Sequence, residues 1–504
     1  ATTQWDMYVA ESIGFAKFDI LSQRGLGHIK DCVDLVERNR GIKIDIHRVQ
    51  AFKEDSKLNE NLYHGEAIGC FYIESPAMRG LLKKLHCNNY KTLVAASSII
   101  RPGVAKSGMM REYIKRFHDQ QHISYLHPVF EQHLKETFGV MVYQEDVIKI
   151  AHHFAGLTLS DADILRRAMS GKFRSKKEFE RIQENFFHNC RQRGYSDALA
   201  QEVWRQMSSF AGYSFCKAHS ASYAVESYQS LYLKTYFPHE FHVAVINNFG
   251  GFYQTWVYIN EARHCGANIR LPDINKSEHL TTLYGNDIYL GLILLKNLEG
   301  ELAQQIVDER KLHGEFQDLS DFTERVPTGN EQLRILIKAG AFRFTGKTKK
   351  QLMWEQLLFA GKTEKRALIA RLFPEKRREF RLPDLKTNVL EDAYDEMELM
   401  GFPVSMSRFD MLQTSYRGNT LAHELLPKLG KVVRMIGELV SLKYVFTVKH
   451  EIMHFGCFLD TCGDFFDTVH FPDSLKKYPF TGQGVYLLEG KVVQEFDYPS
   501  VEIR

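Results

Sequence analysis

The stretch FAGYSFCKAHSASYAVESYQSLYLKTYFP, residues 210–238, predicts a long helix with cationic side chains at its start. The helix is expected to begin near Ala218 and to end at Pro238, whose ring cannot continue a helix. Lys217 and His219 lie at the expected first turn, where backbone N–H groups attract anions. Taken alone, this pattern is compatible with a phosphate site but does not require one.

Arg166 and Arg167 stand together in a second predicted helix. Ser160-Asp161-Ala162-Asp163 has the form of a capping box at the start of that helix, and Gly171 is the expected stop. Adjacent helical residues point about 100° apart, so both guanidinium groups reach one polyphosphate only if the helix lies across it. The alternative is a pair of exposed arginines on a solvated helix face.

Asp19 interrupts the apolar run Phe15–Leu21, which is predicted to be a strand. A carboxylate in such a strand is costly unless it is hydrogen-bonded, paired or bound to a cation. Lys17 shares its face of the strand, because alternate side chains point the same way. We interpret Asp19 as a Mg²⁺ ligand with Lys17 near a phosphate; the alternative is an edge-strand Asp that faces water. No convincing partner carboxylates for a two-metal site are identified in the chain.

The other segments predict a multidomain α+β protein that is mainly helical up to residue 250 and ends in a small all-β barrel or sandwich. A helix follows the strand, with Gly41 just beyond its end. After Gly250 a short mixed segment and small helices lead through residue 345 to a strongly charged helical stretch. Short β-rich runs then recur at turn-punctuated spacing. These runs are Val432–Ile436, Tyr444–Phe446, Phe455–Leu459 and Gly484–Leu488.

Composition narrows the class of protein. The chain has 504 residues, 44% of them hydrophobic and 25% charged, which excludes a wholly disordered protein and suggests three to four soluble domains. There is neither an uninterrupted apolar run of about 18 residues nor a signal peptide, so no membrane partner is expected. The eight cysteines include no Cys-x-x-Cys and are read as reduced thiols of a cytoplasmic protein. The first residue is Ala rather than Met, so the chain is interpreted as a fragment.

Charge is unevenly distributed along the sequence. The net charge is only +3, yet residues 343–386 hold 13 Lys and Arg against 5 Asp and Glu, and residues 101–235 hold 19 against 14. Basic stretches of this kind indicate a polyanionic partner, or else solvated helix faces. Charge alone leaves both alternatives open.

Taken together, these segments resemble the C-family DNA polymerases, the bacterial replicative DNA polymerase III alpha subunits. The matching motifs run in order along nearly the whole chain. They are Phe15–Leu21, Gly69–Arg79, Ile99–Gly103, Ser107–Met109, Gly139–Glu145, Leu165–Met169 and Phe210–Ser220.

The resemblance implies a division into five parts. Residues 1–48 match the end of the palm, in which Asp19 corresponds to a catalytic metal ligand and Lys17 to a lysine near the nucleotide phosphates. Residues 49–250 match the fingers, where Arg166, Arg167, Lys217 and His219 fall in motifs associated with the incoming triphosphate. Residues 251–345 match a small mixed segment with tandem helix-hairpin-helix elements, 346–428 a charged helical connector, and 429–504 an OB-fold.

DNA-binding residues are also implied by the resemblance. Lys296 lies in the first hairpin, which would contact duplex DNA, and the OB-fold would handle single-stranded template. Tyr444, Phe446, Phe455 and Phe458 can stack bases without sequence preference. An OB barrel can equally bury such aromatic side chains in its core.

Three departures from the family pattern stand out. A histidinol-phosphatase-like domain and the first half of the palm, with two further metal-binding aspartates, are absent from the sequence. The hairpin Lys296-Asn297-Leu298-Glu299-Gly300 lacks the usual glycines, which let backbone N–H groups approach a phosphate, so its contact with duplex DNA is in question. No clear Gln-x-x-Leu-Phe clamp-binding motif is present; Gln356–Phe359 is one residue short, and its helical context favours core packing.

The sequence therefore predicts part of a replicative-type DNA-directed DNA polymerase. The complete enzyme would transfer nucleotides from dNTPs to a primer-template with Mg²⁺ as cofactor, and the sliding clamp and other replisome subunits are possible partners. The 504-residue chain alone is expected to be inactive. The alternatives are a non-catalytic nucleic-acid-binding scaffold and an error-prone repair polymerase paralogue.

Overall fold

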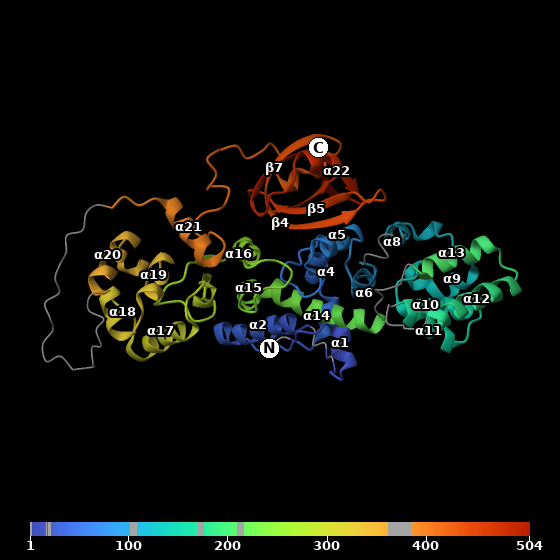
Figure 1. Ribbon diagram of the computed structural model, residues 1–504, viewed down its shortest axis with the longest axis horizontal. Helices are drawn as coiled ribbons and strands as arrows, with labels where there is room; N and C mark the ends of the chain where they lie inside the picture. Colours follow the sequence, from blue (N-terminus) through green and yellow to red (C-terminus); the bar gives the residue numbers. More distant parts are fainter. Residues whose placement is uncertain are drawn as a thin grey trace.

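The computed structural model describes residues 3–16, 18, 22–100, 108–169, 176–208, 216–360 and 385–504 (Figure 1). The molecule is elongated. The group α8–α13 lies at one end, α17–α20 lie at the other, and a β-barrel sits over the central helices α2 and α14–α16. Within the described ranges, no helix combines the length and apolar character that crossing a bilayer requires.

The central group is built around α2 (Gln23–Arg40) and α14 (Lys217–Tyr236), which pack against each other and against α15 (Pro238–Asn247). The helix α2 ends at Gly41, whose φ of +66° is the left-handed conformation that favours glycine. Pro238 ends α14 and begins α15. Both predicted helices and their stops are thus confirmed. The other helices of this group are α1 (Met7–Ser12), α3 (Val49–Glu54), α4 (Ser56–His64), α5 (Pro76–Lys84), α6 (Tyr90–Ile99) and α16 (Thr255–His264).

The predicted strand Phe15–Leu21 is not seen in the described residues. Phe15, Ala16 and Phe18 belong to no regular element, and residues 17 and 19–21 lie outside the described ranges.

The helical group at one end packs around the aromatic rings of Phe154, Phe186 and Trp204. It consists of α8 (Met109–His118), α9 (Pro128–Leu134), α10 (Gln144–His153), α11 (Leu159–Met169), α12 (Lys176–Gln192) and α13 (Asp197–Ser208), with 3-10 turns η1 (Gln120–His122) and η2 (Lys135–Thr137).

The cap of α11 differs from the prediction. The hydroxyl oxygen of Thr158 accepts the backbone N–H of Asp161 at 3.1 Å, and the Thr158 hydroxyl donates to Asp161 Oδ2 at 2.9 Å. Ser160 already lies inside the helix, so the predicted capping box is displaced by two residues. The helix ends at Met169, and the predicted stop, Gly171, lies outside the described residues.

At the other end, a three-stranded sheet of order β1-β3-β2 precedes the helices α17–α20. Strand β3 lies in the short mixed segment predicted after Gly250, and its Ile288 is buried. The elements are β1 (Asn268–Arg270), β2 (Thr282–Tyr284), β3 (Asp287–Tyr289), η3 (Leu292–Leu294), α17 (Gly300–His313), α18 (Leu319–Arg325), α19 (Asn330–Lys338), η4 (Arg343–Thr345), α20 (Lys349–Ala360) and α21 (Val389–Met400).

The C-terminal strands close into a five-stranded barrel of order β4-β5-β6-β8-β7. This order, with the helix α22 (Pro472–Lys477) between the third and fourth strands, is that of an OB-fold and confirms the predicted all-β barrel. Its core contains Phe458, which is fully buried, so of the two alternatives left open for this residue the structure shows core packing. The remaining elements are η5 (Ala422–Glu424), η6 (Leu426–Lys428), β4 (Val432–Phe446), β5 (Ile452–Leu459), β6 (Phe465–His470), β7 (Val485–Glu495) and β8 (Tyr498–Ile503).

The outer face of the barrel rests on the central helices through charged and aromatic side chains. The guanidinium of Arg79 on α5 lies 4.1 Å from the ring centroid of Phe465, and Lys84 Nζ lies 2.5 Å from Glu495 Oε2. Asn260 on α16 donates to the carbonyl of Gly463 at 3.3 Å. The barrel therefore keeps its own core and is joined to the helices by directional contacts together with apolar packing of Val440, Phe465 and Phe496 against the helical core.

Candidate functional site

The first turn of α10 connects two cationic segments that are distant in the sequence. Gln144 Oε1 accepts a hydrogen bond from Arg166 Nη1 at 2.9 Å. Both carboxylate oxygens of Glu145 accept the backbone N–H of Lys217, at 3.2 and 3.1 Å. Because Gln144 and Glu145 are adjacent, Arg166 of α11 and Lys217 of α14 are held at one helix start.

This helix start is fixed by a buried carboxyl group. Asp146 Oδ2 accepts the backbone N–H groups of Val142 and Tyr143 at 3.0 and 2.9 Å. Burial raises the pKa of Asp146 to about 6, although these two hydrogen bonds act in the opposite direction. The turn that carries Gln144 and Glu145 is thereby pinned from inside the helical group.

The two arginines of α11 reach a common carboxylate. Arg166 Nε lies 2.8 Å from Asp163 Oδ1, and Arg167 Nε lies 3.0 Å from Asp163 Oδ2. These ion pairs join residues of one helix at i,i+3 and i,i+4 spacing. They are compatible with both alternatives that the sequence left open, a polyphosphate site and a solvated helix face.

Lys217 begins α14 and is surrounded by acidic and aromatic groups. Its ammonium group donates to both carboxylate oxygens of Glu136, at 2.7 and 2.6 Å, and lies 5.4 Å from the ring centroid of Tyr143. Neither Glu136 nor Glu145 was predicted from the sequence, because each lies in a segment far from Lys217 in the chain. The motif Gly139–Glu145 was the one available signal.

His219 lies in the first turn of α14 and is linked through Tyr223 to another matched motif. Its backbone N–H donates to Cys216 Sγ at 3.4 Å, and its ring lies 4.1 Å from that of Tyr223. Tyr223 in turn makes edge-to-face contacts with Phe71 and Tyr72, at centroid distances of 5.1 and 5.0 Å. The segment Gly69–Arg79 and the start of α14 thus meet through aromatic rings.

The proposed catalytic pair Lys17 and Asp19 lies outside the described residues. Within the described part of the chain, no three or more His, Cys, Asp or Glu side chains gather as a group that could hold a metal ion. The Mg²⁺ site predicted at Asp19 therefore stays a prediction.

Glu226 on α14 is a titratable residue that the sequence analysis missed. Its Oε1 is buried without a hydrogen-bond partner among the described residues, and burial raises the pKa of its carboxyl to about 7. A Cβ at Gly25 would lie 2.6 Å from Glu226 Oε1, so α2 and α14 approach closely only because residue 25 is glycine. A single Glu in an otherwise weakly polar helix face was its only sequence signal.

The aromatic residues of the barrel occupy two faces of the β4–β5 hairpin. Tyr444 is opposite His454 in the register and Phe446 is opposite Ile452, whereas Phe455 is opposite Lys443. Tyr444 and Phe446 therefore share one face, with ring centroids 6.5 Å apart, and Phe455 lies on the other face. All three side chains are exposed.

Lys296 lies in an altered hairpin whose backbone is already engaged. Asn297 adopts φ +64°, a left-handed conformation that Asn tolerates better than most residues. The backbone N–H of Glu299 donates to Gln332 Oε1 at 2.9 Å, and Gln332 Nε2 donates to the carbonyl of Asn297 at 3.0 Å. The backbone N–H of Glu299 is therefore already engaged, whereas the side chain of Lys296 is exposed.

The segment Gln356–Phe359 on α20, which is one residue short of the clamp-binding motif, is partly packed into the protein interior. Gln356 is buried and donates to the carbonyl of Asn330 at 2.6 Å, whereas Leu357 is exposed. The side chains of Leu358 and Phe359 lie outside the described residues.

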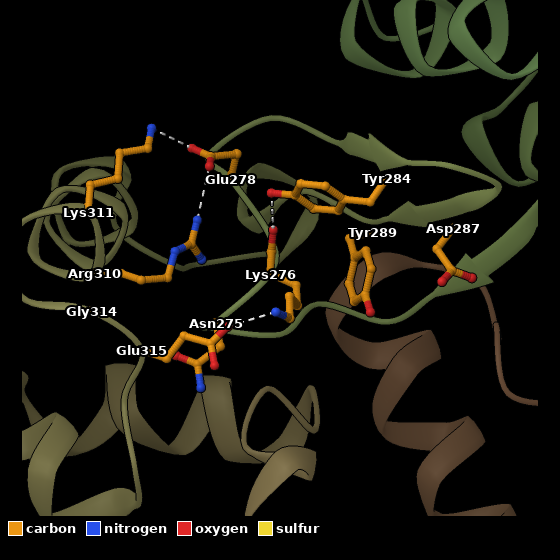
Figure 2. A pocket seen from close by; sticks show the side chains of 10 residues that line it. All are labelled: Asn275, Lys276, Glu278, Tyr284, Asp287, Tyr289, Arg310, Lys311, Gly314 and Glu315. Atoms are coloured by element: carbon orange, nitrogen blue, oxygen red, sulfur yellow. Dashed lines mark hydrogen bonds and ion pairs between the residues drawn. The ribbon is translucent and has the colours of Figure 1, made fainter. Parts of the chain in front are cut away.

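A cavity of about 500 Å³ lies beside the three-stranded sheet, between it and α17 (Figure 2). Arg310 and Lys311 each lie 3.0 Å from a carboxylate oxygen of Glu278, and Lys276 lies 2.7 Å from Glu315. Figure 2 shows the rings of Tyr284 and Tyr289 on the same side of the cavity as Asp287. The charged groups of this cavity balance one another.

Comparison with known proteins places these features in a family. Residues 25–194 match the model of the bacterial DNA polymerase III alpha subunit finger domain, and residues 266–352 match that of the helix-hairpin-helix motif. DNA polymerase III subunit alpha of Staphylococcus epidermidis is 32% identical over 498 residues, which is 97% of this chain and 46% of the relative. The same subunit of Staphylococcus aureus is 37% identical over 355 residues, 70% of this chain and 33% of the relative. The chain thus spans less than half the length of these relatives.

Proposed function

Because the chain belongs to the bacterial DNA polymerase III alpha subunits, we propose that it supplies the nucleotide-binding fingers and part of the DNA-binding surface of a DNA-directed DNA polymerase. One observation carries the proposal: adjacent residues of α10, Gln144 and Glu145, hold Arg166 and Lys217 at one helix start. Cations fixed in this way can offset the charge of a triphosphate during nucleotidyl transfer.

In this proposal the parts of the chain have separate tasks. Residues 1–48 complete the palm, with Asp19 as a metal ligand and Lys17 near the phosphates. Residues 49–250 are the fingers, in which Arg166, Arg167, Lys217 and His219 face the incoming dNTP. Mg²⁺ in the complete enzyme would activate the primer 3′-hydroxyl and stabilise pyrophosphate as the leaving group.

The DNA contacts are assigned to the C-terminal half of the chain. Residues 251–345 would bind duplex DNA with Lys296 facing a phosphate, and residues 346–428 connect them to the OB-fold at 429–504. Tyr444 and Phe446, which share one exposed face, would stack single-stranded template bases, and Phe455 would contact DNA from the other face. A cytoplasmic location and a replisome with a sliding clamp follow from the same family assignment.

The nucleotide-binding part is tested by titrating a fluorescent dNTP into the 504-residue chain. The double variant Arg166→Ala/Lys217→Ala is expected to bind at least about tenfold more weakly, because it loses two charge-assisted contacts. Arg191→Ala is the matched control, since Arg191 is exposed on α12 and pairs with Asp197 at 3.1 Å. Equal affinity in the double variant and the control would refute the assignment of this site.

The polymerase part is tested by primer extension. The isolated chain is expected not to extend a primer, because it holds only one of the carboxylates proposed for the metal site. A longer protein that restores the preceding palm segment should extend the primer and lose that activity with Asp19→Ala. Extension by the isolated chain that is abolished by Asp19→Ala would contradict the first expectation.

A further inference from the structure

Two carboxylates engage the donors of Lys217, and they differ in how firmly they are held. Glu145 is partly buried, lies beside the pinned turn at Tyr143, and accepts the backbone N–H of Lys217. Glu136 lies on the surface in η2 and accepts from the ammonium group with both oxygens, at 2.7 and 2.6 Å. The ammonium group is the donor with which Lys217 would reach a phosphate, so Glu136 occupies the same position as a phosphate group would.

We propose that Glu136 is an internal competitor for the polyphosphate ligand of Lys217 and thereby sets the affinity of the fingers for nucleotides. The proposal rests on the proposed function, in which Lys217 binds the triphosphate. The Glu136 carboxylate holds the ammonium group of Lys217 beside Tyr143. A ligand must displace this carboxylate before it can bind the ammonium group.

The exposure of this ion pair makes the exchange possible. The side chains of Lys217 and Glu136 are 45% and 58% exposed, and exposed pairs of this kind contribute little to stability. A triphosphate offers several negative oxygens and also attracts the arginines of α11, so it can replace a single carboxylate at Lys217. The fraction of molecules with Lys217 available multiplies the affinity of every ligand that needs it.

The chain contains a closely matched ion pair that serves as a control. Lys276 Nζ lies 2.7 Å from Glu315, and the two side chains are 46% and 58% exposed. This pair lines the cavity beside the three-stranded sheet and α17 (Figure 2), and α17 lies at the end of the molecule whereas α14 is central (Figure 1). Glu315→Gln therefore removes the same charge from the same kind of pair without freeing Lys217.

The experiment is calorimetric titration of inorganic tripolyphosphate into the 504-residue chain. Glu136→Gln should bind roughly two- to sixfold more tightly than wild type, whereas Glu315→Gln should match wild type. Lys217→Ala should bind more weakly, and adding Glu136→Gln to Lys217→Ala should restore nothing, because the competition requires both partners.

Each other outcome is decisive. If Lys217→Ala weakens binding but Glu136→Gln behaves like Glu315→Gln, the competitor role is wrong and the nucleotide site stands. If Glu136→Gln tightens binding equally in the presence and absence of Lys217, the effect is a general charge effect and the inference fails. If Lys217→Ala leaves binding unchanged, the proposed nucleotide site fails and the inference fails with it.

Discussion

Arg166 donates to Gln144 across 2.9 Å, and through this bond a helix that carries two arginines is tied to the turn that also holds Lys217. The Gln144 side chain is uncharged, so its effect on ligand binding would come from the position in which it holds the Arg166 guanidinium group. This relationship distinguishes a positioning residue from the cations it positions.

Gln144→Ala is accordingly expected to weaken binding of a fluorescent dNTP roughly two- to tenfold, the range of one lost hydrogen bond. The salt dependence of binding should stay that of wild type, because no cation is removed. Fluorescence titration at two salt concentrations measures both quantities. Gln192→Ala on α12 is the control, and equal affinities for the two variants would argue against a positioning role.

Glu226 predicts a specific pH dependence of stability. Its pKa is raised from about 4.5 to about 7 by burial, so the folded chain retains a proton that the unfolded chain releases. Stability contributed by the protonated carboxyl is therefore lost as pH rises from about 4.5 to about 7. From pH 5 to pH 8, the free energy of unfolding of Glu226→Gln should rise by about 1–2 kcal/mol relative to that of wild type, because wild type loses stability over this range. The full pKa shift would imply a larger difference, but the side chain is only partly buried.

Thermal unfolding at pH 5 and pH 8 measures this gain as a difference in midpoints. Glu184→Gln, an exposed residue of α12, should show the same midpoint offset at both pH values. A pH-independent offset for Glu226→Gln would mean that its carboxyl titrates normally in the folded chain.

The two faces of the β4–β5 hairpin predict unequal roles in binding single-stranded DNA. Tyr444→Ala and Phe446→Ala should each weaken binding of oligo-dT by about 1–3 kcal/mol, the contribution of one stacked base. Phe455→Ala should have a separate and additive effect, because its ring lies on the opposite face beside Lys443. Fluorescence anisotropy with a labelled oligo-dT measures these losses. Unchanged binding by the Tyr444→Ala/Phe446→Ala variant would contradict the proposal that this face of the barrel stacks template bases.

Duplex binding should depend steeply on salt. Each phosphate neutralised by a cation contributes about −0.9 to the slope of log K against log salt. Lys296→Ala should therefore make the slope about 0.9 less steep, whereas Arg191→Ala, which removes the same charge from α12 outside residues 251–345, should leave it unchanged. A flat salt titration of wild type would count against phosphate contacts by this part of the chain.

The elements that were predictable are those with a local stop signal. Gly41 ends α2 and Pro238 ends α14, and both signals act within a single turn of helix. The cap of α11 was misassigned because Ser160 and Thr158 offer the same hydroxyl chemistry. The geometry that chooses between them is set by the packing of the helical group.

Strand β6 shows why parts of the barrel escaped prediction. Its inward positions are Phe466, Thr468 and His470, and all three are buried. Thr468 and His470 are tolerated there because their side chains lie 2.9 Å apart and satisfy each other. An apolar alternation that would mark the strand is therefore missing from the sequence.

In the candidate site, the sequence identified the cationic residues Arg166 and Lys217 but not the acidic residues that contact Lys217. Arg166 and Lys217 belong to quoted motifs, which mark them without reference to a partner. Glu145 also belongs to a quoted motif, but neither it nor Glu136 could be paired with Lys217 before the tertiary contacts were seen. Sequence patterns report periodicity within an element, whereas these pairings join different elements.

The barrel has a core of its own and meets α5 through a few charged and aromatic side chains. Val440 and Phe496 of the barrel also pack against the core of the helical body. Another barrel could be seated on the same helices only if it presented an aromatic ring to Arg79, a carboxylate to Lys84 and apolar side chains in these two places. The two cores are separate, but the surface between them is shared, so a change on one side of it calls for a matching change on the other.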